Sequence, residues 1–195
     1  MKNFFAAMMF ALILTVASFS EVAEAAATFT AEQNEQIISL TAELSAVENP
    51  LPVDEMTFRR NFDDFIANFV REVDAGDDAA ELQRLLSFNE PTVQIRDEGT
   101  VSVKNFFDRI AIVGLSDGGK FKVLNLFATQ LDDRDDALLN ALILQAFVKS
   151  ITPDFDSTSL LRAAKKNPKS PVIHGGVRYF ISREGNLNIV TAIAE

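Results

Sequence analysis

The chain contains no cysteine among its 195 residues. This absence excludes disulfide scaffolds, thiol redox chemistry, a cysteine nucleophile and thiolate metal sites. It also excludes a lipid-modified cysteine as a membrane anchor. The fold must therefore be held by an apolar core, which a chain of this length can bury without a covalent staple.

Polar aromatic residues are almost missing, because the chain has 17 Phe but one Tyr and no Trp. Carbohydrate binders usually present Trp or Tyr, whose rings stack and whose polar edges form hydrogen bonds. Sugar recognition is therefore disfavoured. Phe has no polar group, so its place is a core or an apolar ligand cavity.

Positive charge is in short supply, with 18 basic against 28 acidic residues and a net charge of −10 at pH 7. A chain this acidic repels nucleic acid and anionic lipid surfaces, so we expect no nucleic-acid partner. Basic partners fit better, and so does a surface that is acidic only for solubility.

Motifs that mark reactive sites are also missing. The single histidine, His174, has no Gly-x-Ser-x-Gly elbow elsewhere in the chain to supply a nucleophile, and we expect it to be a turn residue. The segment Gly118-Gly119-Lys120 lacks the phosphate-loop spacing and is typical of a hairpin turn. The acidic run 132–136 lacks the pattern of an EF-hand loop and fits the start of a helix. We therefore assign no catalytic residue, metal ligand or cofactor.

The first 25 residues, Met1 to Ala25, have a pattern typical of a secretory signal peptide. Lys2 precedes the uncharged apolar run 4–16, and Ala23-Glu24-Ala25 offers a cleavage site before Ala26. A membrane anchor is the alternative, but the run is shorter than the ~20 residues that a span needs. We predict an exported protein, periplasmic or secreted and of a bacterial type, with no stable membrane span after cleavage.

The segment 26–52 is predicted to be an N-terminal helix and linker. Thr30 and Gln33 have the spacing of a capping box, and Asn49-Pro50 ends the helical pattern. The rest, 53–195, is predicted to be one α+β domain, because about 170 residues after cleavage suit a single domain.

A stripe of four phenylalanines is the strongest helical feature of that domain. Phe58, Phe62, Phe65 and Phe69 recur at helical spacing after Asp54, a candidate N-cap. Such a stripe normally faces a core. The alternative is that these four rings form the wall of an apolar ligand site.

Further along the chain, the hydrophobic pattern changes from helical spacing to the alternation of apolar and polar residues that strands show. Hairpins are predicted around Asp97-Glu98-Gly99, Ser116-Asp117-Gly118-Gly119 and Glu184-Gly185-Asn186, with helices between the second and third hairpins. We therefore predict an α+β fold, with an antiparallel sheet of about four to six strands packed against helices.

The predicted function is that of a non-catalytic envelope protein that binds another protein or a small apolar ligand. Two alternatives stay open. One is a hydrolase that uses a pair of carboxylates, which needs no visible sequence motif. The other is a protein inhibitor or chaperone that docks through its first helix, 30–47.

Overall fold

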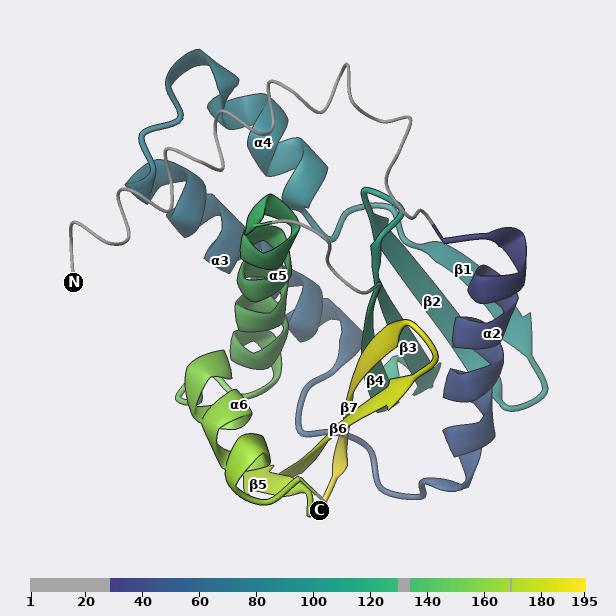
Figure 1. The fold of residues 1–195 in the computed structure, drawn as a ribbon. Coiled ribbons are helices and arrows are strands. Elements are labelled where there is room, and N and C mark those ends of the chain that lie inside the picture. The colour runs from purple at the N-terminus through teal and green to yellow at the C-terminus, as the bar shows by residue number, and fades with distance from the viewer. Residues whose placement is uncertain (1–28, 130–133, 169) are drawn as a thin grey trace.

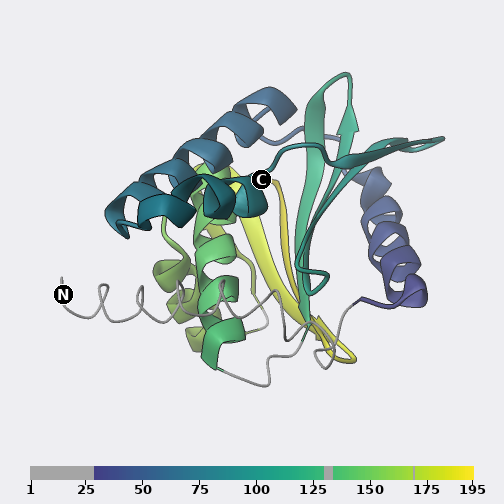
Figure 2. The ribbon, with the colours of Figure 1, turned by 90° about the horizontal axis from the view of Figure 1, so that it is seen from above.

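The computed structural model describes residues 29–129, 134–168 and 170–195 (Figure 1). The predicted signal peptide and its cleavage site between Ala25 and Ala26 lie outside these residues. Within them, one antiparallel sheet has helices on both faces. Figure 2 shows α2 alone on one side of the strands, and α3, α4, α5 and α6 together on the other.

The sheet has seven strands in the order β1-β2-β3-β4-β7-β6-β5, and every neighbouring pair is antiparallel. The first four strands follow one another as a meander. The chain then leaves the sheet through α5 and α6 and returns at the opposite edge, so that its last strand, β7, closes against β4. The strands are β1 Thr92–Arg96, β2 Gly99–Phe106, β3 Ile110–Asp117, β4 Lys120–Thr129, β5 Val172–His174, β6 Val177–Glu184 and β7 Leu187–Ala194.

The predicted α+β class with an antiparallel sheet is confirmed, but the strand count of four to six was too low. The strand that the sequence did not reveal is β5, which pairs with β6 through Val172, Ile173 and His174. Three residues are too few to show a period of two. Their hydrogen bonds come from a neighbour already in the sheet, which no local pattern records.

Local capping signals place most helix starts correctly. Thr30 and Gln33 form the predicted capping box of α2, and the side chain of Asp54 accepts from Thr57 N at the start of α3. Asp78 precedes α4 but makes no side-chain capping bond, because it is the last residue of a 3-10 turn and has helical geometry. The helices are α2 Ala31–Ala42, η1 Glu43–Ala46, α3 Glu55–Glu72, η2 Gly76–Asp78, α4 Ala79–Leu86, α5 Arg134–Ile151 and α6 Ser157–Lys166.

The sheet separates two apolar clusters. On one face, α2 buries Ile37 and Ile38 against side chains of β2, β3, β4 and β7. A buried hydrogen bond of 2.9 Å from Asn125 Nδ2 to Thr41 Oγ1 ties this helix to β4. The other face carries the larger cluster, to which α3, α4, α5 and α6 contribute. Strand β4 is covered on both sides, as its two apolar faces indicate.

Helix α5 contains the most hydrophobic stretch of the chain after residue 26. Ile143, Ala146, Phe147 and Val148 in it are fully buried in the larger cluster. Across the part of the chain that the structure describes, none of the helices combines the length and apolar character that a membrane crossing requires.

Candidate functional site

The phenylalanine stripe on α3 divides into two halves with different surroundings. Phe58 and Phe62 have no exposed surface. The ring of Phe58 meets Phe88, Phe121 and Phe147 edge-on, at centroid distances of 5.2, 5.7 and 6.2 Å. This half of the stripe is core packing between α3, β4 and α5, as apolar stripes usually are.

Phe65 and Phe69 lie one to two turns further along α3 and are only partly buried. They line an open cleft of about 500 Å³ between α3, α5 and the beginning of α6. In Figure 1 these three helices are neighbours on the same side of the sheet. The structure thus brings Phe65 and Phe69 to one open cleft and places Phe58 and Phe62 in the core beneath it. The lining residues are Phe65, Asn68, Phe69, Glu72, Ala141, Leu142, Gln145, Asp156, Ser157 and Thr158.

Polar groups of α5 and α6 are held in fixed positions at this cleft. Gln145 Oε1 accepts from the backbone N–H of Ser157 at 2.8 Å and from its hydroxyl at 2.5 Å. Asp156 accepts from Ser159 N and Ser159 Oγ, each at 2.8 Å. The hydrogen bond from the Ser159 backbone lowers the pKa of Asp156, so this carboxylate carries its charge at neutral pH.

Sequence reasoning missed Gln145 and Ala141 as site residues. The sequence did contain one signal: the polar residue Gln145 and the small residue Ala141 both lie within the most apolar helix. Such a polar residue indicates a hydrogen-bond partner from another element, but the pattern does not name that partner.

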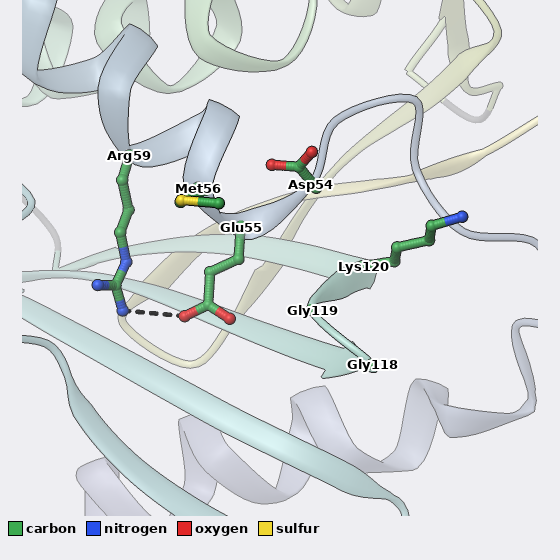
Figure 3. A pocket seen from close by; sticks show the side chains of 7 residues that line it. All are labelled: Asp54, Glu55, Met56, Arg59, Gly118, Gly119 and Lys120. Carbon is green, nitrogen blue, oxygen red and sulfur yellow. Dashed lines mark hydrogen bonds and ion pairs between the residues drawn. The ribbon is translucent and has the colours of Figure 1, made fainter.

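A second hollow, of about 430 Å³, lies between the start of α3 and the β3–β4 turn (Figure 3). Glu55 N donates to Gly119 O at 3.0 Å, which joins the helix to this turn. Figure 3 shows the Arg59 side chain directed at Glu55, and the two form an ion pair of 2.9 Å. Gly118 and Gly119 have positive φ, which suits the predicted hairpin turn. The arginine of this hollow is therefore already paired with an acid of the same helix.

His174 ends strand β5, and the prediction of a turn residue was wrong. Its ring stacks on Phe155 with centroids 4.3 Å apart, and Nε2 lies 3.1 Å from Asp154 Oδ2. The imidazole beside it lowers the pKa of Asp154. These contacts attach the loop between α5 and α6 to the β5–β6 hairpin.

Tyr179 lies beneath this stack. Its hydroxyl is 2.6 Å from Thr152 Oγ1, and burial raises its pKa to about 12. The phenol therefore stays protonated at neutral pH, which fits a structural hydrogen bond rather than a catalytic base.

Asp63 on α3 is a half-buried carboxyl outside both hollows. Burial raises its pKa, although its Oδ1 accepts from Phe88 N at 2.6 Å and Lys104 lies near enough to oppose the rise. Burial also lowers the pKa of Lys104, whose Nζ donates to Asn89 O at 2.8 Å. Asp63 thus fixes the start of the loop that leads from α4 to β1.

Of the acidic run 132–136, the structure describes the backbone of 134–136, which begins α5, but neither Asp132 nor Asp133. In the residues it does describe, no group of three or more acidic or histidine side chains could hold a metal ion.

No protein-family model, no curated protein and no solved structure matches this chain. The function must therefore be argued from the chemistry of the site itself.

Proposed function

We propose that this chain is an exported, non-catalytic binding protein that receives an apolar group in the cleft between α3, α5 and α6. The observation that carries the proposal is the exposure of Phe65 and Phe69 at an open cleft, while Phe58 and Phe62 of the same stripe are closed in the core. Ligand cavities are concave and lined mostly by apolar side chains, and these two rings provide such a lining.

The size and lining of the cleft support this proposal. Its volume of about 500 Å³ falls in the range of small-molecule sites, which have an apolar lining and a few placed polar groups. Leu142 adds apolar surface to that of the two rings. Gln145 and Thr158 supply polar groups at the edge, and the first of these is held rigid by Ser157.

A binding role fits the titratable groups better than hydrolysis does. General acid–base catalysis needs a group with a pKa near the working pH, close to its partner. At the cleft, the pKa of Asp156 is lowered, away from neutral pH, and each of its oxygens accepts a hydrogen bond from Ser159. Burial raises the pKa of Asp63, and the charges of Lys104 and Asp64 act on it in opposite directions. Asp64 is the next residue of the same helix, and successive helix residues do not face each other, so the two do not form a catalytic pair.

Docking through the first helix is also less well supported. The apolar residues Ile37 and Ile38 of α2 are already buried against the sheet. A partner would therefore meet only the polar side of this helix, unless α2 left the sheet.

Binding of the uncharged dye N-phenyl-1-naphthylamine, measured by fluorescence titration, tests the proposed function. The protein should enhance the emission of the dye, and the double variant Phe65→Ala with Phe69→Ala should weaken binding about tenfold or more. Phe180→Ala is the matched control. Phe180 is 38% exposed, and its register with Thr191 and Asn125 places it on the α2 face of the sheet.

Equal loss in the control, or no dye binding by the unaltered protein, would refute the cleft as the binding site. Thermal unfolding followed by circular dichroism establishes that each variant is folded. Native mass spectrometry of the protein recovered from its own cells would then show any bound small molecule, and whether the mature chain begins at Ala26.

A further inference from the structure

We infer that the cleft between α3, α5 and α6 prefers a cationic amphiphile: an aliphatic chain that ends in an ammonium group. The inference rests on the proposed function and adds the sign of charge that the ligand carries. Its basis is the distribution of charge around the lining of the cleft.

The charged residues that line the cleft are both acids. Glu72 is the last residue of α3, and Asp156 is the N-cap of α6, so the two carboxylates belong to different helices. Between them, Phe65, Phe69 and Leu142 provide apolar surface. An aliphatic chain fits that surface, and an ammonium group at its end would be attracted to either carboxylate.

The N-terminus of α6, which is the positive end of its helix dipole, also lies at the cleft. The backbone N–H groups of this first turn already have acceptors, however. Ser157 N donates to Gln145 Oε1, and Ser159 N donates to Asp156 Oδ1. The protein therefore supplies its own negative cap, which leaves little reason for an anionic ligand to bind there.

Two bases lie outside the lining of the cleft and donate to uncharged acceptors, so each keeps its charge, and the charge of Lys149 acts on Asp156. Arg71 donates to the side chain of Asn68 and to Ala67 O. Lys149 donates to Pro153 O at 2.8 Å. Neither residue lines the cleft. The net charge of −10 adds a long-range field of the same sign, which attracts cations and repels anions.

Three probes with the same decyl chain test the inference by isothermal titration calorimetry: decyltrimethylammonium, decyl maltoside and decyl sulfate, each below its aggregation concentration. At low salt the cation should bind about tenfold more tightly than the anion, with the uncharged probe between them. Raising the salt concentration should reduce this difference, because exposed charges are screened.

The decisive variant is Glu72→Gln with Asp156→Asn. Asparagine caps a helix as well as aspartate does, so α6 should keep its N-terminus while the cleft loses both charges. This variant should bind the three probes with similar affinity. The control is Glu32→Gln with Glu43→Gln, which removes the same net charge from exposed positions on α2 and at the start of η1, across the sheet. It should keep the preference for the cation.

The outcomes separate this inference from the proposed function. If the uncharged probe binds and the cation gains nothing over the anion, the inference is wrong and the proposed function stands. A control pair that abolishes the preference as fully as the cleft pair would also overturn it, because the effect would then come from net charge alone. If none of the probes binds, both fail together.

Discussion

The two ends of the phenylalanine stripe on α3 have the same spacing but opposite surroundings. Phe58 and Phe62 meet aromatic rings from β2, β4, α5 and the loop after α4. Phe65 and Phe69 instead line the cleft where α5 presents Ala141 and Gln145. Within α3, Ile66 and Val70 follow Phe58 and Phe62 at intervals of four residues, and all four are buried. Phe65 and Phe69 fall beside that buried row, where α5 presents the small side chain of Ala141. The difference therefore arises on α3 as well as on α5.

The largest expected effect comes from truncating the closed end. Phe62→Ala should reduce the free energy of unfolding by about 3–5 kcal/mol, because it removes a fully buried ring and leaves a cavity. Phe69→Ala should cost less than half as much, since its ring already contacts solvent. Urea denaturation of the two variants measures both values, and equal losses would contradict the division of the stripe.

Larger side chains on α5 test the same comparison between the buried and the open end of the stripe. Ala146 is fully buried, so Ala146→Leu should overpack the core and cost about 1–3 kcal/mol. Ala141 is exposed at the cleft, so Ala141→Leu should change stability by less than about 0.5 kcal/mol. The second variant should nevertheless block the dye, because leucine fills the space that the dye would occupy. Unchanged dye binding by Ala141→Leu would place the ligand elsewhere.

The polar edge of the open end depends on Gln145. Gln145→Ala should cost about 1–2 kcal/mol, because the N–H and hydroxyl of the buried Ser157 lose their acceptor. Gln145→Glu keeps an acceptor oxygen and should recover much of that loss. Hydrogen exchange at the first turn of α6 should accelerate in the alanine variant only. Protection that is the same in both variants would show that α6 docks without this contact.

The smallest effect is expected at Asp63, on the polar side of α3. Its pKa is raised in the folded state, so the folded protein binds this proton more tightly, and stability falls as the pH rises through the unfolded value of about 4 towards the folded value. Asp63→Asn should therefore be slightly more stable than the unaltered protein at pH 7. This gain should vanish at pH 3, where the carboxyl is protonated in both states. Urea titrations at the two pH values measure it, and a gain that is independent of pH would point to a cause other than ionisation.

Much of the fold followed from short-range patterns. The caps at Thr30 and Asp54 and the three hairpin turns were predicted and are present in the structure. Each depends on residues within a few positions of one another, whose hydrogen bonds and periodicity are local. The candidate site could not be predicted in the same way. Phe65 and Phe69 were named as part of a possible ligand wall, but the spacing of the stripe did not show that Ile66 and Val70 would take the buried positions beside them.

Tertiary structure alone decided which residues meet across long separations. It brought Ala141 and Gln145 opposite α3, gave β5 its partner strand, and stacked His174 on Phe155. The amino-acid sequence by itself determined the α+β class, the helix starts and the apolar stripe, because these follow from backbone hydrogen bonding and side-chain periodicity. Whether a stripe closes into a core or opens into a cleft depends on the volume of the side chains packed against it, which are distant in the chain.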